Sequence, residues 1–255
     1  MFTIASWNVN SLKVRLPQVQ AWLELQQPDV LALQETKMQD IHFPVDALRN
    51  ANWHVMFAGQ KTFNGVAIIS KQAAILKATE LPTYADEQRR VLGVEIGNLF
   101  ILNLYVPNGQ AVGSSKYQYK LEWLAALRQY VKELLARYPY VIVLGDFNIA
   151  PTDLDVYDPL AWEGTVLVSP QEREQWQHLI NLGLVDTFRG LHHHQEFSWW
   201  DYRQASFRRN HGLRIDHILT SKSLLPHLAA CWIDKQPRSS TCPSDHAPII
   251  AQFAL

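Results

Sequence analysis

Short apolar runs recur along the chain, and most of them stop at a polar residue or a turn. They occupy residues 2–7, 30–33, 66–69, 91–96, 99–104, 141–144, 215–219 and 249–253. Their length and β-branched content favour strands over helices. Several follow one another with no helical segment between them, so we expect mixed or antiparallel sheets.

Three segments between the runs carry apolar residues at helical spacing. They span residues 17–26, 117–137 and 170–182, and the second has the clearest 3.6-residue stripe. Before the third, Ser169 suits a helix N-cap and Pro170 the first turn. Residues 150–168 show no strong pattern, and we predict a functional loop there. The pattern therefore predicts an α+β protein.

Composition limits the class of protein. The chain has 255 residues, 47% of them hydrophobic and 18% charged, with a formal net charge of −1. That is enough for one large domain, or two fused halves of similar build, and it argues against disorder. A nucleic-acid partner would need a local basic patch, because the total charge does not indicate one.

The cysteines and the length of the apolar runs indicate the cellular compartment. Cys231 and Cys242 lack CxxC or zinc-ligand spacing, which is typical of a reduced cytosolic protein. The apolar runs are too short to span a membrane, and no export signal precedes the first one. We expect a soluble cytoplasmic protein.

Polar residues gather where the apolar runs begin or end. If these ends share one rim of a sheet, their side chains would form one site. The set is rich in oxygen donors and poor in thiolates, which suits Mg²⁺ or Mn²⁺ and argues against structural zinc. It comprises Asn8, Asn10, Glu35, Tyr105, Asn108, Asp146, Asn148, Asp216, Asp245 and His246.

Each of these signals also has an ordinary structural interpretation. The Gly145-Asp146 pair is equally typical of a tight turn, and Glu35 of an exposed strand end or a helix cap. Ser244-Asp245-His246 also suits a turn. All of them in this order would require a series of coincidences, so together they favour a site.

Seven motifs in this order resemble the exonuclease III and AP endonuclease family. They are WNVNSL (7–12), LQETK (33–37), YVPNG (105–109), GDFNIA (145–150), LVDTFR (184–189), GLRID (212–216) and SDHAP (244–248). The resemblance implies one DNase I-like domain over residues 1–255, built from two similar halves. It also implies a four-layer α/β sandwich of two packed mixed sheets flanked by helices. A divalent metal and DNA phosphodiester cleavage follow from the same resemblance.

The resemblance also implies roles for the polar set. Glu35 would be the principal metal ligand, with Asn10 beside it and Asp245 as a second-metal or outer ligand. Asp146 would orient and deprotonate the attacking water, and Asn148 would hold the phosphate or that water.

Further polar groups would face the phosphate. His246 would donate to it as an imidazolium favoured by Asp216. Tyr105 and Asn8 would add polar contacts, and Asn108 would be a further phosphate contact.

Residues 197–214 form a segment rich in arginine and aromatic residues that suits DNA. Within it Trp199 and Trp200 alternate along an expected strand, and we favour Trp199 for the site and Trp200 for the core. Leu213 and Ile215 would form the neighbouring wall. Phosphate candidates are Arg89, Arg90, Lys116, Lys120, Arg208 and Arg209.

Residues 162–168 depart from the family pattern. Leu167 stands where relatives carry a small residue, and Val168 where they carry Phe. A bulky side chain there would hinder a flipped-out abasic sugar within duplex DNA but leave a frayed 3′ end accessible. This predicts weaker abasic-site incision than 3′-end processing, unless Leu167 packs inward.

The sequence thus predicts a Mg²⁺-dependent nuclease of DNA base excision repair. It would act at 3′ ends as exonuclease, 3′-phosphatase and phosphodiesterase, and activity at abasic sites is left open. Its partner would be double-stranded DNA with 3′ ends, nicks or abasic sites, and the protein would be a monomer without an obligate protein partner. Two alternatives are an inositol lipid phosphatase or sphingomyelinase of the same fold, and a non-catalytic DNA-binding module.

Overall fold

The computed structural model describes residues 1–49 and 52–255, and its strands form two six-stranded sheets. The first sheet has the order β11 (Leu228–Ile233), β12 (Ile249–Phe253), β1 (Phe2–Asn8), β2 (Val30–Gln34), β4 (Val66–Ser70) and β3 (His54–Ala58). The second has the order β5 (Ile75–Ala78), β6 (Val91–Ile96), β7 (Leu99–Tyr105), β8 (Tyr140–Asp146), β10 (Asp216–Ser221) and β9 (Leu184–Asp186).

Both sheets share one pattern of strand directions. The pairs β1–β2 and β7–β8 are parallel, and the other neighbouring pairs are antiparallel. In each sheet the parallel pair stands third and fourth in the order. The sheets are therefore mixed, as predicted. The shared pattern supports two similar halves within one domain, which stays a prediction.

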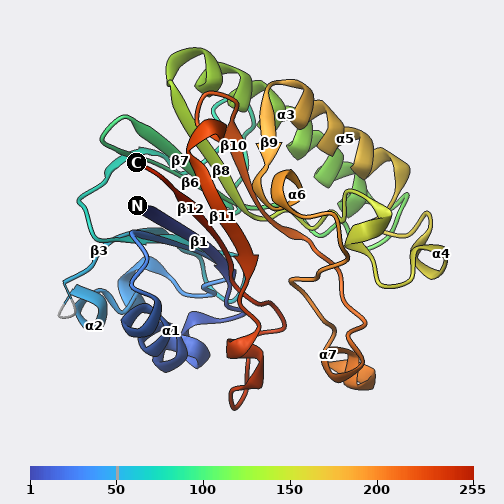
Figure 1. Ribbon diagram of the computed structural model, residues 1–255, viewed down its shortest axis with the longest axis horizontal. Helices are drawn as coiled ribbons and strands as arrows, with labels where there is room; N and C mark the ends of the chain where they lie inside the picture. The colour runs from blue at the N-terminus through green and yellow to red at the C-terminus, as the bar shows by residue number, and fades with distance from the viewer. Residues whose placement is uncertain (50–51) are drawn as a thin grey trace.

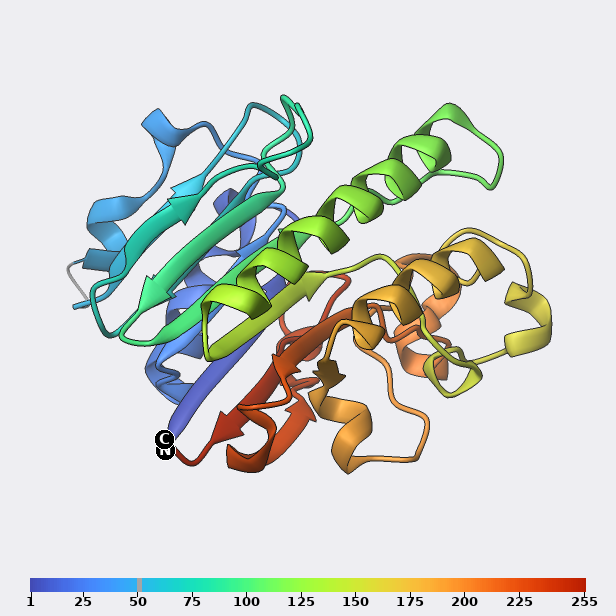
Figure 2. The same cartoon turned by 90° about the horizontal axis from the view of Figure 1, so that it is seen from above.

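Helices cover the outer face of each sheet (Figures 1 and 2). On the first sheet α1 (Leu12–Gln26) and α2 (Val45–Arg49) contribute Trp22, Leu23 and Leu48 to a buried cluster. On the second, α3 (Ser115–Arg137) and α5 (Pro170–Asn181) contribute Trp123 and Trp176 to another cluster. The described residues also form three short α-helices: α4 (Pro159–Trp162), α6 (Thr187–Leu191) and α7 (Ser206–Arg209).

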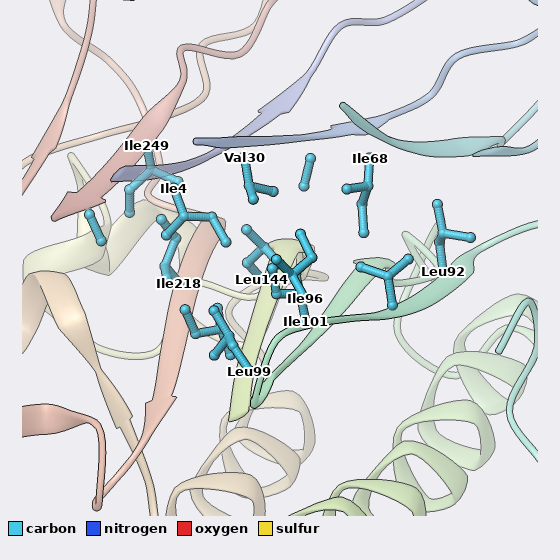
Figure 3. Packing of buried hydrophobic residues seen from close by; sticks show 14 of the residues in the cluster. Ile4, Val30, Ile68, Leu92, Ile96, Leu99, Ile101, Leu144, Ile218 and Ile249 are labelled. Atoms are coloured by element: carbon cyan, nitrogen blue, oxygen red, sulfur yellow. The ribbon is translucent and has the colours of Figure 1, made fainter. Parts of the chain in front are cut away.

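The central core lies between the two sheets (Figure 3). Ile4, Val30 and Ile68 from the first sheet meet Ile101 and Leu144 from the second, and all are fully buried. Burying one such side chain contributes roughly 1.5–3 kcal/mol. The rigid sandwich that results is the four-layer fold predicted from the resemblance.

All eight predicted runs form strands, and four further strands were not predicted: β3, β5, β9 and β11. Each of the four lies at a sheet edge. The predicted helix over 17–26 begins earlier, at Leu12, and contains Pro17. Ser169 caps α5 as expected, because its side chain accepts a hydrogen bond from the Glu172 amide.

The prediction of a strand within residues 197–214 was wrong. Trp199 makes only isolated bridges to Leu213 and His246, and the segment continues through a 3₁₀ turn (Arg203–Ala205) into α7. Positive φ angles at Gln204 and Ala205 are incompatible with an extended strand. Over residues 1–49 and 52–255, no helix has the length and apolar character needed to cross a membrane.

Candidate active site

Strand ends from both sheets converge at one end of the sandwich. In the parallel pairs, Asn8 lies opposite Gln34 at the ends of β1 and β2, and Tyr105 lies opposite Asp146 at the ends of β7 and β8. Strand β10 is antiparallel to β8 and begins with Asp216 opposite Asp146. The polar residues predicted from widely separated segments therefore share one rim.

Gly145 explains how β7 and β8 approach each other at this rim. Its φ is +142°, and an added Cβ would lie 1.9 Å from the Leu104 carbonyl oxygen. Only glycine avoids that backbone clash. The Gly145-Asp146 pair is therefore required by strand packing, and it delivers the Asp146 carboxylate to the site.

Glu35, Asp146 and His246 form the centre of the site. Each offers one ligand atom, and these atoms lie within 4.8 Å of one another. The Asn8 Nδ2 group donates to Glu35 Oε1 and to Asp146 Oδ2, both at 2.9 Å, and so holds the two carboxylates together. Two carboxylates with amide oxygens nearby fit a hard divalent cation such as Mg²⁺ or Mn²⁺.

Glu35 follows β2 in a left-handed conformation with a φ of 52°. Lys37 Nζ lies 2.8 Å from its Oε2. Burial alone would raise the pKa of Glu35, but Lys37, the Asn8 amide and His246 outweigh it and lower that pKa. Glu35 therefore stays an anion and a competent cation ligand.

His246 lies between two buried carboxylates. Its Nδ1 donates to Asp216 Oδ2 at 2.8 Å, and its Nε2 lies 3.8 Å from Asp146 Oδ2. Burial would lower the pKa of His246, but Asp216 and Asp146 raise it to about 10. The predicted pairing of His246 with Asp216 is present, and the ring turns a protonated Nε2 toward the site.

Asp146 is nearly fully buried. Burial raises its pKa to about 7, and His246 and the Asn8 hydrogen bond only partly offset this increase. Its Oδ1 accepts from the backbone amide of Asn148 at 2.9 Å. A carboxylate with a pKa near neutrality is suited to accept a proton from water.

Tyr105 and Arg90 form one wall of the site. The Arg90 guanidinium lies over the Tyr105 ring at 4.9 Å. Burial raises the pKa of Tyr105 well above its ordinary value, and Glu35 and Asp146 add to the effect, so the phenol keeps its proton. Both residues, with Asn108, line a pocket of about 950 Å³ that continues from the site.

Asn148 follows β8 and is joined to Asn108. Asn108 Nδ2 donates to Asn148 Oδ1 at 3.2 Å, and Asn148 Nδ2 donates to the Val106 carbonyl at 3.0 Å. Asn108 is exposed, whereas Asn148 is buried. The pair therefore links the surface of the pocket to the residue next to Asp146.

Asn10 and Asp245 lie on the other side of the centre. Asn10 Nδ2 donates to Asp245 Oδ1 at 3.0 Å, and Lys37 Nζ donates to Asn10 Oδ1 at 2.5 Å. Among the described residues, the group of close ligand atoms does not include Asp245. The Asp245 carboxylate therefore lies beside the centre and is hydrogen-bonded to it through Asn10.

Trp199 stands beside Asp245, because its Nε1 donates to Asp245 Oδ2 at 3.0 Å. Trp199 is half-buried, whereas Trp200 is fully buried, as predicted. Leu213 and Ile215 are buried in the cluster behind Trp199. They form the neighbouring wall that supports Trp199, but they have almost no exposed surface for the direct DNA contact that was also expected of them.

Asn8 and Lys120 differ from expectation, whereas Leu167 follows the alternative left open for it, which was inward packing. Asn8 is fully buried between the carboxylates and not available to DNA. Lys120, expected as a phosphate contact, is also fully buried and paired with Glu172. Leu167 is 5% exposed and packs inward against the same cluster as Leu213. Burial of these side chains depends on tertiary packing that the local sequence does not reveal.

The exposed arginines occupy a projecting part of the fold. Arg208 and Arg209 lie on α7, and both are exposed. Figure 1 shows α7 at the end of an extended segment, beyond the end of β1. Both side chains are therefore open to solvent on this segment.

Lys37, Arg15 and Tyr202 were not singled out from the sequence. Arg15 donates to the Asn10 carbonyl at 2.5 Å and to the Tyr202 hydroxyl at 3.1 Å, and Tyr202 also meets Asn10. Lys37 lies inside the LQETK motif, and that position was its only signal. Tyr202 lies inside the arginine- and aromatic-rich segment 197–214 but was not singled out within it, and Arg15 carried no signal.

The sandwich and its acidic rim define the class of protein. The profile of the Endonuclease/Exonuclease/phosphatase family matches residues 5–246, and the chain belongs to that family. Within it, the chain belongs to the exonuclease III and AP endonuclease group. It is 38% identical to Exodeoxyribonuclease III of Haemophilus influenzae over 97% of this chain and 98% of the relative. It is 33% identical to Exodeoxyribonuclease of Bacillus subtilis over 96% and 97% of the two chains.

Solved structures agree with this assignment. The 3′-5′ exonuclease NExo of Neisseria meningitidis superimposes with a TM-score of 0.95 at 44% identity, over 100% of both chains. An AP endonuclease of Archaeoglobus fulgidus gives a TM-score of 0.96 at 34% identity, also over 100% of both chains. A third structure is a 3′ phosphatase NExo variant from Neisseria bound to a product DNA hairpin, at 43% identity and a TM-score of 0.95, with full coverage of both chains.

Proposed function

We propose that the protein is a divalent-metal-dependent DNA repair nuclease that hydrolyses phosphoesters at DNA 3′ ends. The convergence of Glu35, Asp146 and His246 at one rim carries this proposal. The relatives support it, because their names include exodeoxyribonucleases, a 3′-5′ exonuclease and a 3′ phosphatase. None of the relatives named above is a lipid phosphatase or sphingomyelinase.

Mg²⁺ or Mn²⁺ is the proposed cofactor. Glu35 would hold the ion, with the Asn10 amide oxygen beside it and Asp245 in an outer position behind Asn10. When bound, the ion would neutralise phosphate charge and favour departure of the 3′ oxygen. Lys37 shares Glu35 Oε2 and Asn10 Oδ1, so it orients both groups toward one point.

The remaining residues supply proton transfer and charge stabilisation. Asp146 accepts the proton of the attacking water, and Asn148 holds that water or the phosphate. His246 donates from Nε2 to a phosphate oxygen, while Asp216 keeps its ring oriented and charged. Tyr105 is a neutral phenol at neutral pH and donates a further hydrogen bond.

DNA would lie across the rim from the pocket wall to α7. Arg90 and Asn108 contact phosphates on the pocket side, and Arg208 and Arg209 contact them on the other side. Trp199 covers the terminal sugar or base, supported from behind by Leu213 and Ile215. Asn8 acts indirectly, by holding the two carboxylates at a fixed separation.

Leu167 bears on the relative strength of abasic-site incision and 3′-end processing. Its φ is +76°, an unusual conformation for leucine, and its side chain fills the cluster behind Trp199. Because this side chain packs inward and not into the site, we propose that it acts through Trp199, which packs on the same cluster, and that the resulting position of Trp199 makes abasic-site incision weak compared with 3′-end processing. Leu167→Gly removes the side chain at a backbone geometry that glycine adopts freely.

This proposal is tested on duplex DNA with one internal abasic site. Leu167→Gly is expected to gain incision relative to its own 3′-end activity. Leu160→Gly, which removes an exposed leucine side chain outside this loop, is the control. No gain in Leu167→Gly means that the leucine is only a packing residue.

A panel of defined duplexes tests the main proposal. Substrates with a 3′-hydroxyl, a 3′-phosphate and an internal abasic site are compared with and without Mg²⁺. Asp146→Asn is expected to lower 3′-end hydrolysis by about 10²- to 10⁴-fold, since it removes the general base. Asp153→Asn, which alters an exposed carboxylate, is the control. Hydrolysis that persists in EDTA would exclude the proposal.

We also propose a cytoplasmic monomer with no obligate protein partner. The free thiols of Cys231 and Cys242 suit a reducing compartment. Sedimentation at the concentrations used for activity assays would show a single species of 29.3 kDa.

A further inference from the structure

Lys120 is an unusual residue in the core. It lies on α3, and its side chain is fully buried. An ammonium group has three N–H donors, and all three have partners here. Nζ donates to the Asn148 carbonyl at 2.6 Å, to the Asn108 carbonyl at 3.2 Å, and to Glu172 Oε1.

Glu172 extends these contacts to the loop over residues 163–168. Its Oε1 accepts from the Leu167 amide at 3.0 Å. Its Oε2 accepts from the Ser169 amide at 3.1 Å and from the Ser169 hydroxyl at 2.5 Å. One buried ion pair therefore fixes three backbone segments: the loop after β7, the loop after β8 and the loop before α5.

The backbone near Lys120 is shaped to fit it. Gly109 has a φ of +93°, and an added Cβ would lie 3.1 Å from Lys120 Cδ and 3.3 Å from Val166 Cγ2. A larger residue at position 109 would push the Asn108 loop away from the lysine. The loop after β7 thus rests directly on the Lys120 stem and on the 163–168 loop.

Stability alone is a weak reason for this arrangement. Taking two charges out of water is costly, and apolar replacements of similar volume often fold as well or better. The atoms that the pair holds are instead the carbonyls of Asn108 and Asn148, whose side chains are joined to each other beside Asp146. The arrangement favours a positioning role.

We propose that Lys120 and Glu172 are positioning residues that set Asn148 and Asn108 against Asp146 and tie them to the Leu167 loop. The inference rests on the proposed nuclease function. The pair would then influence both the rate of 3′-end hydrolysis and the preference between 3′ ends and abasic sites. It would do so without touching DNA.

The test uses the double variant Lys120→Met/Glu172→Gln, which removes both charges and leaves neither one unpaired. We expect kcat for 3′-phosphate removal to fall about 10- to 100-fold, as for a small misplacement of a catalytic group. KM should change less than kcat, because Asn108 is the one phosphate contact among those proposed that the pair holds directly, whereas Arg90, Arg208 and Arg209 lie elsewhere. The ratio of abasic-site incision to 3′-end hydrolysis should also change, because the 163–168 loop loses its anchor.

Leu134→Ala is the control for general destabilisation, since Leu134 is buried on the same helix far along from Lys120. It should lower the melting temperature but leave kcat and the activity ratio unchanged. A folded double variant with wild-type kcat and ratio overturns the proposal, as does an equal loss of kcat in Leu134→Ala.

Gly109→Ala provides a second route if the double variant does not fold. It displaces the Asn108 loop from Lys120 without altering a charge, and the same fall in kcat and the same change in ratio are expected. Unchanged kinetics in a folded Gly109→Ala overturns the proposal. Failure of the underlying function is distinct, because wild-type protein would then show no hydrolysis of any DNA substrate.

Discussion

At the scale of single residues, the charge on His246 depends on its two carboxylate neighbours. Asp216 accepts a hydrogen bond from Nδ1 of His246. Its negative charge raises the pKa of His246 and also raises the pKa of Asp146. Ser198 donates to the same Asp216 oxygen at 2.7 Å. The pair acts in the proposed reaction only while the imidazole keeps its proton.

Asp216→Asn should therefore move the pH profile of kcat to lower pH. In the wild type the raised pKa keeps His246 protonated well above neutrality, and activity is lost only as pH rises through that pKa. Without the Asp216 charge His246 deprotonates at lower pH, and Asp146 ionises at lower pH as well. Single-turnover rates measured across the neutral and alkaline range would show both limits displaced downward.

Ser198→Ala is the matched control, because it removes a hydrogen bond from the same carboxylate without removing charge. It should displace the profile much less. An alkaline limit that is identical in Asp216→Asn and wild type would refute the role given to this pair.

The polar rim was predictable because its members stand at the ends of apolar runs, where strand geometry places them together. Glu35, Asp146 and His246 are examples. The places of Asn8 and Lys120 were not predictable. Both are polar residues whose burial depends on partners far away in sequence, Asp146 for the first and Glu172 for the second.

At the scale of elements, the interior strands were predicted and the edge strands were missed. Interior strands such as β2 and β4 are buried along their whole length, which yields an unbroken apolar run. Edge strands face water on one side, and β5 has exposed residues at most of its positions. Its polar and apolar residues therefore give no continuous signal.

Strand β10 also carries a buried histidine that links pH to stability. His217 Nδ1 accepts from Arg214 Nη1, and Nε2 donates to the Ile149 carbonyl, each at 2.9 Å. Burial, with Arg214 adding to it, lowers the pKa of His217 from 6.5 to about 4. The folded protein therefore holds His217 in its neutral form where β8 and β10 meet.

We predict that stability falls as pH drops from 6.5 toward 4. In that window the unfolded chain binds a proton that the folded chain excludes, so this contribution is fully present above pH 6.5 and is lost on acidification. The loss amounts to roughly 3 kcal/mol. The free energy of unfolding, measured with urea at several pH values, should vary less with pH in His217→Gln than in the wild type.

His193→Gln changes an exposed histidine and should keep the wild-type dependence. Equal pH slopes in wild type and His217→Gln would contradict the account of this junction.

At the scale of the whole molecule, the two sheets form a rigid body with its chemistry at one end. The layered fold was predicted through the family resemblance, whereas the run pattern alone gave only mixed sheets. The chain has a formal net charge of −1, so attraction to DNA rests on where its cations lie. We propose that the exposed arginines of α7 supply part of that attraction.

The double variant Arg208→Ala/Arg209→Ala should bind DNA with a weaker dependence on salt. Each phosphate contact contributes about 0.9 to the slope of log K against log salt concentration, so the slope should fall by up to about 2. Fluorescence anisotropy in Ca²⁺ over a range of salt concentrations would measure it. Lys132→Ala/Arg137→Ala on α3 should leave the slope unchanged, and an unchanged slope in the α7 variant would exclude these contacts.

The most direct test asks whether one acidic rim performs metal-dependent chemistry. It measures the initial rate of 3′-end hydrolysis against Mg²⁺ concentration for the wild type and Glu35→Ala. We predict a saturable dependence on Mg²⁺ for the wild type and no measurable turnover for a folded Glu35→Ala at any Mg²⁺ concentration that saturates the wild type. Turnover in Glu35→Ala with the same Mg²⁺ dependence as the wild type would contradict the account.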